Sequence, residues 1–363
     1  MGSTKNPKSF RSAAAGLPAF RSTDDLARHL GLSRWTVSRV INGHPGVHPE
    51  TARRVREAME TYRFAPNPLA RGLRRGRTSM IGVCLPDIEV FYLGQKLEFL
   101  RRCFEERGFQ VMVGLRGSGP VEEARTLARF RELRVAGLVV MASRLLPEST
   151  ALRHLAEAGI PVVMVDPLNA GFETALTVDR TLGTREALAH LAELGHRRVA
   201  TLGLSGDGAY TSQRRRALDE TAAARGIRVR HLSFTQEGSF YQSGRLAGQR
   251  LIKTLRRRTA ARPTALMTIN DRVAIGVMDA LREHGISVPG DLSLVGYDNM
   301  EIAGFMTPRL TSIDAGPSRL IQDTTDALLR ALEGGPPLPH EPLPTRLVVR
   351  ESTARPRDPH APP

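Results

Sequence analysis

The residues best suited to recognition chemistry lie together in the stretch RWTVSR. When this stretch is drawn as a helix, Val37 falls on one side, whereas Arg34, Trp35, Ser38 and Arg39 fall on the other. An arginine can donate two hydrogen bonds to guanine, and an indole ring can contact the methyl group of thymine. A tryptophan between arginines on the wet face of a helix therefore indicates base or phosphate contact. The alternative for Trp35 is packing that closes the module against the next segment.

Short helices must position these side chains. Ser22 is a good N-cap for a first helix, which Gly31 ends. Ser33 caps a second helix over 34–41, and a third helix runs from about 49 to 61. A helix, a glycine turn and a capped second helix form a helix-turn-helix, whose second helix enters the major groove of DNA. We expect phosphate contacts or capping from the nearby polar residues Ser33, Thr36 and Asn42.

The positive charge of the chain is concentrated near its N-terminus. The 363 residues carry 52 Lys or Arg against 37 Asp or Glu, a formal net charge of +15. Residues 1–78 hold 15 of these basic residues and 5 of the acidic ones, so that two thirds of the excess lies in about a fifth of the chain. A GC-rich genome would explain the preference for Arg over Lys, but it does not explain the clustering. A basic module on a near-balanced body indicates a polyanion partner.

Composition and motifs exclude several other classes of protein. No apolar run approaches the roughly 20 residues that span a bilayer, and the first twenty residues lack a secretory signal, so we expect a cytoplasmic protein. Cys84 and Cys103 are too few for a disulfide scaffold or a Cys-based zinc site. His44 and His48 lie around a turn without acidic or Cys partners. The sequence contains no GxSxG, HExxH or Walker motif, so we expect no enzyme activity, no metal and no cofactor.

From Met80 onward, short apolar runs alternate with helical stretches. The runs lie at 80–85, 109–114, 136–141, 160–166, 198–204, 228–234, 264–269 and 292–298. Continuous apolar strands that alternate with helices predict parallel sheets covered on both faces, and eight such strands indicate two sheets. The expected fold class is α/β, with a helix-turn-helix head in front of a body of two doubly wound parallel-sheet lobes.

A linker separates the head from the body. It contains a helix of barely two turns, Leu69 to Arg74, with Gly72 inside it. Glycine costs about 1 kcal/mol relative to alanine in a helix, so we expect this helix to be ordered only when bound. The predicted segments are a disordered basic extension (1–21), a helix-turn-helix domain (22–63), a hinge linker (64–78), a body (79–350) and a disordered Pro-rich tail (351–363).

The stretches LARHLGLSRWTVSRVING, GVHPETARRV and FAPNPLARGL resemble the DNA-binding head and hinge of the lactose/galactose-repressor (LacI/GalR) family. The resemblance continues through IGVCLPDI, RVAGLVVM, IPVVMVD, LGHRRVATLG, VPGDLSLVGYDN and PRLTSID, and it covers about residues 22–350. It implies a homodimer that binds a pseudopalindromic DNA operator, and a periplasmic-binding-protein-like body that senses a small effector. In such a body the first lobe spans about 79–177 plus 309–334, and the second about 178–306 plus 336–350.

The resemblance also implies roles for single residues of the head and hinge. Arg34, Trp35 and Arg39 match the family's base-reading positions, although tryptophan is unusual there. Leu73 matches the hinge leucine that wedges into the minor groove and kinks the operator, with Ala70 packed beside it. The alternative for Leu73 is an ordinary linker leucine that covers the body.

For the effector, the resemblance points to loops at the carboxyl ends of the strands. Arg214 matches the family arginine that reaches the effector, and Asp271 matches an aspartate that binds ligand hydroxyls. Carboxylates around a neutral polyol suit a sugar, although Arg214 would equally bind a carboxylate or phosphate. The alternative for each aspartate is a helix cap or a turn. The remaining candidates are Asp87, Tyr92, Asp166, Asp179, Asn270 and Asp298.

One segment departs from the family pattern. Where the family often has Ser-Asn-Pro-Phe-Phe, this chain has EVFYL at 89–93, so an asparagine is lost and an acid is gained. The sequence thus predicts a ligand-responsive transcriptional regulator, expected to be a repressor, with a sugar or sugar derivative as effector. The rival functions are a cytoplasmic solute-binding receptor and a sugar-modifying enzyme that carries a DNA-binding head.

Overall fold

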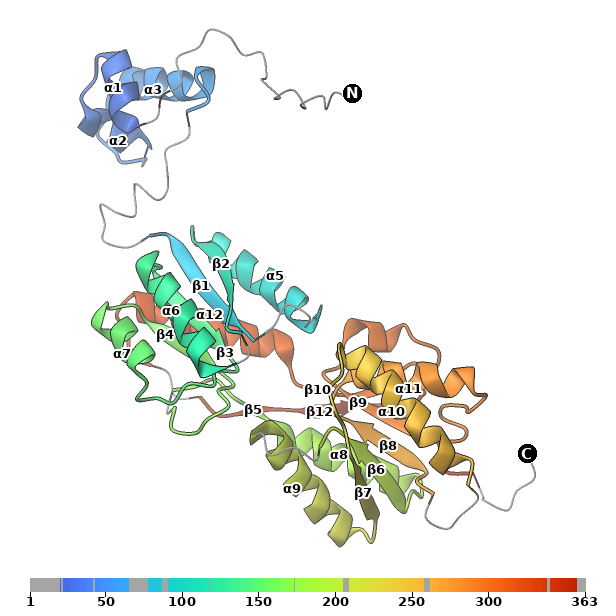
Figure 1. The fold of residues 1–363 in the computed structure, drawn as a ribbon. Helices are drawn as coiled ribbons and strands as arrows, with labels where there is room; N and C mark the ends of the chain where they lie inside the picture. The colour runs from blue at the N-terminus through green and yellow to red at the C-terminus, as the bar shows by residue number, and fades with distance from the viewer. Residues whose placement is uncertain are drawn as a thin grey trace, which may run out of the picture. The chain divides into compact units, whose positions relative to one another are not determined.

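The computed structural model divides into two compact units, Met1–Ser79 and Met80–Pro363 (Figure 1). It describes residue 20 and residues 22–41, 43–64, 78–86, 91–117, 119–172, 174–204, 209–257, 262–337 and 340–357. Of the predicted N-terminal extension and hinge, all but Phe20, Phe64 and Thr78 lie outside these ranges.

The first unit, here called the head, contains three short helices. They are α1 (Thr23–Leu30), α2 (Arg34–Ile41) and α3 (Pro49–Thr61). Ser22 caps α1, because its hydroxyl accepts the Asp25 amide hydrogen at 3.2 Å, and Gly31 ends it in the left-handed conformation. Leucine, valine and alanine side chains of all three helices pack together with Phe64 in one small core. The predicted helix-turn-helix is therefore confirmed.

The first lobe of the second unit is a parallel four-stranded sheet in the order β2-β1-β3-β4. Helices lie on both of its faces, so every residue of β1 and β3 is buried, as the continuous apolar runs predicted (Figure 1). Its strands are β1 (Met80–Leu85), β2 (Gln110–Leu115), β3 (Gly137–Met141) and β4 (Val162–Val165). Its helices are α5 (Phe91–Glu105), α6 (Pro120–Glu132), α7 (Thr150–Glu157) and α12 (Pro317–Leu332).

The second lobe is built on a six-stranded sheet in the order β12-β10-β9-β8-β6-β7. Only β12 is antiparallel to its neighbour in this sheet. The strands are β6 (Arg198–Leu202), β7 (Arg228–Leu232), β8 (Ala265–Thr268), β9 (Ser293–Tyr297), β10 (Thr311–Asp314) and β12 (Arg346–Val348). The helices are α8 (Arg180–Glu193), α9 (Ala209–Ala224), α10 (Phe240–Leu255), α11 (Asp271–Glu283) and the 3-10 turn η1 (Glu301–Gly304).

The helices α10 and α11 approach each other closely because glycines line their contact. A Cβ at Gly276 would lie 2.2 Å from the carbonyl oxygen of Tyr241, and one at Gly244 would lie 2.4 Å from the carbonyl oxygen of Val273. No larger residue fits either position without moving a helix backbone.

The chain passes between the lobes three times. Two of these connections pair as short parallel strands, β5 (Val178–Asp179) with β11 (Leu343–Pro344). The third runs between β10 in the second lobe and α12 in the first. The predicted boundary is therefore wrong at one place: residues 311–314 belong to the second lobe, because β10 pairs with β9 and β12.

The predicted disorder of the tail is also wrong for residues 351–357, which pack against the second lobe. Ser352 is fully buried, its hydroxyl donates to the Leu294 carbonyl at 2.6 Å, and the Thr311 amide donates to that hydroxyl at 2.8 Å. Farther along, the buried His196 donates from Nε2 to the Ala354 carbonyl at 2.9 Å. The prolines predicted a disordered tail, but these hydrogen bonds hold residues 351–357 against the sheet.

Candidate DNA-binding surface and ligand pocket

The second helix of the head, α2, starts at a well-formed cap. The Ser33 hydroxyl accepts the Thr36 amide hydrogen at 3.0 Å and lies 2.8 Å from the Thr36 hydroxyl. Val37 and Val40 turn into the core of the head. Ser33 thus caps the helix and Thr36 contacts the cap, and phosphate contact by either residue stays a prediction.

The opposite face of α2 carries the predicted recognition residues. Trp35 is 66% exposed, so its ring does not close the module within the described head. The Arg39 guanidinium lies 4.7 Å from the centre of the Trp35 ring and donates a hydrogen bond to the Pro45 carbonyl. Ser38 is half-buried beside them. Trp35 and Arg39 therefore lie together on the outside of α2, and Arg34, at the start of the same helix, is also exposed.

Arg34 has a partner that sequence reasoning missed. Its Nε lies 3.0 Å from Oδ1 of Asp24, in the first turn of α1. An acid in the first turn of a helix is common because its negative charge interacts favourably with the positive end of the helix dipole. Nothing in the local sequence therefore singled out Asp24. The other predicted DNA contacts, Asn42, Ala70 and Leu73, lie outside the described residues.

In the second unit, two predicted effector residues line one pocket of about 700 Å³. Asp166 follows β4 in the first lobe, and Asp179 closes β5 at the start of the second. Gln213, next to Arg214, and Glu341 contribute further polar side chains. Phe172 and Leu168 supply apolar walls. A pocket with several polar groups between apolar walls is suited to a small polar ligand.

Asp166 forms a two-pronged ion pair with Arg180, the first residue of α8. The Arg180 nitrogens lie 3.1 and 2.7 Å from the two carboxylate oxygens, and both side chains are at most 15% exposed. Asp166 also accepts the Val178 amide hydrogen at 3.1 Å. The pair therefore joins the first lobe to the second at the pocket wall. Sequence reasoning omitted Arg180, although a charged residue directly after a strand and before a helix was a usable signal.

Asp179 is the N-cap of α8. Its Oδ1 accepts the Thr181 amide hydrogen at 2.8 Å and the Thr181 hydroxyl at 2.6 Å. Partial burial raises the pKa of Asp179, but these hydrogen bonds outweigh burial and leave the pKa below its ordinary value. Asp179 therefore has the helix-capping role that was the alternative to effector binding, and it also lines the pocket.

Arg214, on α9, is buried and held against the carboxyl end of β8. Its terminal nitrogens donate to the carbonyls of Ile269 at 2.7 Å and Thr268 at 3.1 Å, and its guanidinium lies 3.9 Å from the centre of the Tyr297 ring. Burial lowers the pKa of Arg214 to about 10. Each terminal nitrogen therefore uses one of its two N–H groups to hold the backbone of β8 and the residue after it.

The Tyr297 hydroxyl and the Arg214 Nε are buried without a hydrogen-bond partner in the described structure. Burial raises the pKa of Tyr297 to about 12, while the charges of Arg214 and Arg180 oppose the rise. Asp298 has a φ of 100°, a strained conformation for a residue other than glycine. Unsatisfied donors of this kind mark a place where a ligand hydroxyl or a water would bind.

Asp271, predicted to bind ligand hydroxyls, has partners within the second lobe, and ligand binding by it stays a prediction. The side chain is fully buried, and its two oxygens accept hydrogen bonds from the Met300 amide at 2.7 Å and the Ser312 hydroxyl at 2.6 Å. Burial raises the pKa of Asp271 to about 8. Its neighbour Asn270 is the N-cap of α11 and accepts the Val273 amide hydrogen. Both residues fasten elements of the second lobe. Asp87 and the side chain of Tyr92 lie outside what the structure describes.

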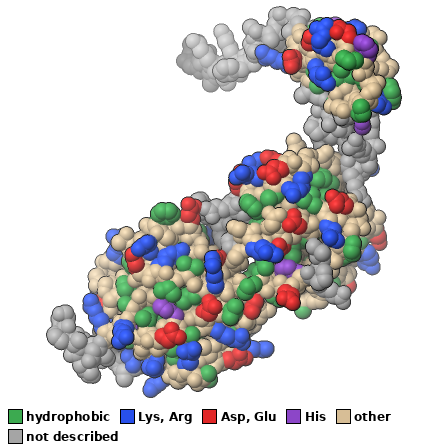
Figure 2. Space-filling model, turned by 180° about the vertical axis from the view of Figure 1, so that it is seen from behind, with side chains coloured by type: hydrophobic (Ala, Val, Ile, Leu, Met, Phe, Trp, Pro, Cys, Tyr) green, Lys and Arg blue, Asp and Glu red, His purple; other side chains and the backbone are tan. Residues whose placement is uncertain are grey.

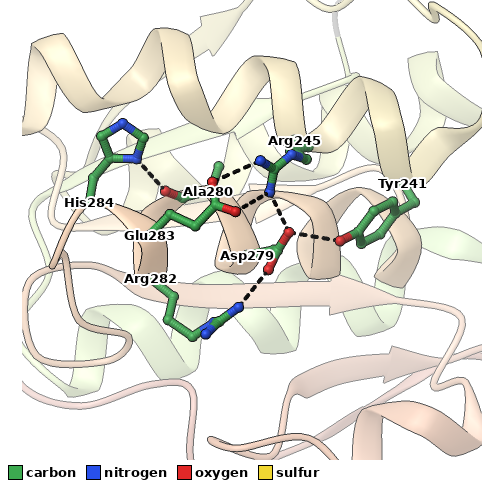
Figure 3. A network of polar contacts seen from close by, with 7 residues as sticks. All are labelled: Tyr241, Arg245, Asp279, Ala280, Arg282, Glu283 and His284. Atoms are coloured by element: carbon green, nitrogen blue, oxygen red, sulfur yellow. Dashed lines mark hydrogen bonds and ion pairs between the residues drawn. The ribbon is translucent and has the colours of Figure 1, made fainter.

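A second pocket, of about 450 Å³, lies on the second lobe beside an ionic network. Figure 3 shows Tyr241 and Arg245 of α10 reaching Asp279 and Glu283 of α11, with the Tyr241 hydroxyl 2.8 Å from Asp279 and Arg245 2.8 Å from Glu283. The apolar lining includes Met278 and Met306. Near it, Phe305 and Ile302 are 77% and 48% exposed. An apolar patch of this kind is typical of a protein–protein contact.

The described surface of the body carries charges of both signs. On the face shown in Figure 2, basic and acidic side chains alternate over the body instead of forming a patch of one sign. Among the described residues, no cluster of three or more His, Cys, Asp or Glu could hold a metal ion. None of the described helices is long and apolar enough to cross a membrane.

Comparison with known proteins matches both units. A family model described as bacterial regulatory proteins, lacI family, matches residues 22–67, and one described as a periplasmic binding protein-like domain matches residues 188–353. The HTH-type transcriptional repressor PurR of Vibrio atlanticus is 30% identical over 318 residues, which cover 85% of this chain and 91% of that protein. Catabolite control protein A of Priestia megaterium is 28% identical over 295 residues, which cover 80% of this chain and 86% of that protein.

Two solved structures resemble most of the chain. The Lac repressor dimer bound to operator and the anti-inducer ONPF superposes with a TM-score of 0.78 at 26% identity, over 92% of this chain and 99% of that chain. The complex of the transcriptional regulator CelR with cellobiose gives a TM-score of 0.62 at 26% identity, over 92% and 100%. With its helix-turn-helix head and two-lobed body, the chain belongs to the lacI family of bacterial regulatory proteins, which are DNA-binding transcriptional regulators.

Proposed function

We propose that the protein is a transcriptional repressor whose α2 reads an operator and whose body senses a small effector. The observation that carries the proposal is the exposed face of α2, where Trp35 lies between two arginines on the second helix of a helix-turn-helix. Packing of the head does not explain why Trp35 is left 66% exposed on this helix. In the major groove, however, the same three side chains meet base edges and phosphates.

The effector is proposed to be a neutral, polyhydroxylated molecule. The pocket offers the carboxylates of Asp166 and Asp179 with the amide of Gln213, which suit ligand hydroxyl groups. Arg214 is engaged by two backbone carbonyls, which argues against a carboxylate or phosphate ligand. A relative of 26% identity was solved with cellobiose, a sugar, which supports the same class.

The protein is proposed to act as a homodimer in the cytoplasm and to carry out no catalysis itself. The similar Lac repressor was solved as a dimer on its operator, and a two-fold dimer would place two copies of α2 on the two halves of a pseudopalindrome. Binding of effector between the lobes would then change operator affinity through a coupling of about 1–3 kcal/mol.

The test is equilibrium binding to an operator selected from random duplexes and to an unrelated duplex. Substitution of Arg34, Trp35 or Arg39 by alanine should each weaken operator binding by about 1–3 kcal/mol and change binding to the unrelated duplex little. Equal losses on both duplexes would assign these residues to phosphates instead. Failure to select any sequence would refute the proposed function.

A further inference from the structure

A pair of opposite charges joins the two helices of the helix-turn-helix. Nε of Arg34, the first residue of α2, lies 3.0 Å from Oδ1 of Asp24, in the first turn of α1. Arg34 remains 47% exposed and Asp24 45%, so the pair lies on the surface of the head. Because an exposed ion pair adds little to stability, its main effect is on the position of the guanidinium.

The contact engages one edge of the Arg34 guanidinium. An arginine presents five N–H donors in a planar fork, and here a carboxylate oxygen lies beside the Nε edge. The two terminal nitrogens remain for a bidentate contact at the far end of the group, which matches O6 and N7 of guanine. A side chain already held in this orientation also loses less rotamer freedom when it binds.

We propose that Asp24 is a positioning residue for base recognition, which orients Arg34 end-on toward a guanine. The inference rests on the proposed function, because it requires Arg34 to read a base. The carboxylate has a second effect: it repels the phosphates of any DNA sequence. Asp24 therefore lowers binding to DNA in general while it sharpens the choice of one base pair.

The neighbouring acid provides a matched control. Asp25 lies in the same turn of α1 but pairs with Arg28, at 2.7 Å. Substitution of either aspartate by asparagine removes one negative charge from the same place, so both variants gain the same attraction to phosphates. Only Asp24→Asn changes the acceptor of Arg34.

The experiment uses the full-length protein and duplex DNA. A binding sequence is selected from random duplexes with the wild type, and affinities are measured for it and for all of its single-base replacements. At the base pair where Arg34→Ala lowers the preference for the selected base, we expect Asp24→Asn to lower that preference about 3- to 10-fold. Asp25→Asn should keep the wild-type preference there. Both asparagine variants should bind an unrelated duplex a few-fold more tightly at low salt. Thermal unfolding of each variant shows that the head is intact.

Two results would overturn the positioning role. One is wild-type discrimination by Asp24→Asn at every base pair, and the other is an equal loss in Asp24→Asn and Asp25→Asn. Unchanged discrimination in Arg34→Ala would remove Arg34 from base reading, and the role of Asp24 with it, while a selected operator would still support the repressor. Absence of any selected sequence would refute the repressor function itself.

Discussion

Trp35 and Arg39 are in contact on the outer face of α2, the proposed recognition surface. The Arg39 guanidinium lies 4.7 Å from the centre of the Trp35 ring, so loss of either side chain removes the same contact. We therefore expect the double variant Trp35→Ala/Arg39→Ala to lose less operator affinity than the sum of the two single losses, with a coupling of about 0.5–3 kcal/mol. A double-mutant cycle of operator binding measures it.

A control for that cycle is Trp35 with Arg53, which pairs with Glu50 and Glu57 on α3 and has no contact with the ring. The Trp35/Arg53 pair should be additive. Additive losses for Trp35 and Arg39 as well would show that the stacked geometry plays no part on DNA.

Asp271 makes the stability of the second lobe depend on pH. Burial raises its pKa from 3.8 to about 8, so between these values the folded state holds a proton that the unfolded state releases. The stability conferred by this carboxyl is complete below about pH 4 and is lost as pH rises through about 8. Asp271→Asn should remove this pH-dependent contribution. The free energy of unfolding in urea should therefore fall more between pH 5 and pH 8.5 for the wild type than for the variant. Parallel curves would contradict the raised pKa.

The sequence could not predict which side chains contact each other when they lie on different elements of the fold. Asp271 carries a family motif, yet its buried oxygens are taken by Met300 and Ser312, which follow it by 29 and 41 residues. The Asp24–Arg34 pair likewise depends on how α1 and α2 cross. By contrast, the face of α2 was predictable, because the helical period alone separates Val37 from Trp35.

At the scale of elements, local chemistry predicted most of the fold. The caps at Ser22 and Ser33 and the proline at position 49 fixed the starts of all three head helices, and all eight apolar runs became strands. The strands β10 and β12 were missed because they are short and polar in part, and their place in the second sheet depends on pairing between distant segments.

The segment 351–357 is a structural part of the second lobe. The Ser352 hydroxyl both donates to the Leu294 carbonyl and accepts from the Thr311 amide, out of contact with solvent. Ser352→Ala should lower the free energy of unfolding by about 1–3 kcal/mol, because it leaves these backbone groups buried and unpaired. Glu351→Gln is the control, since its ion pair with Arg309 is exposed and should matter little. Equal unfolding midpoints for the two variants would show that the tail is not tied down.

For the molecule as a whole, the Asp166–Arg180 pair connects the two lobes. Asp166→Asn keeps a residue that tolerates the φ of 48° at this position but leaves Arg180 without its charge partner. We expect it to lower the free energy of unfolding by about 1–3 kcal/mol, and the double variant Asp166→Asn/Arg180→Gln to lose less. Urea unfolding of the wild type, of Asp166→Asn, of Arg180→Gln and of the double variant tests this. A double variant that is less stable than both single variants would contradict it.

The homodimer is predicted to use the exposed apolar patch of the second lobe. Phe305 and Ile302 stand beside the pocket that Met278 and Met306 line, so a second copy would bury them. Phe305→Glu and Ile302→Glu should yield folded monomers in sedimentation, whereas the wild type and Val349→Glu, another exposed apolar position, stay dimeric. A dimeric Phe305→Glu protein would place the interface elsewhere. A tetrameric wild type would contradict the predicted homodimer.

The exposed ring on α2 has an optical consequence. Trp35 is the single tryptophan of the chain, so the indole emission of the whole protein arises from the surface proposed to face DNA. Titration with a duplex should change its intensity and wavelength, whereas unfolding of the body should leave the signal nearly constant. Every step of operator binding and release can then be followed in the unlabelled protein, and a silent titration would show that DNA docks away from this helix.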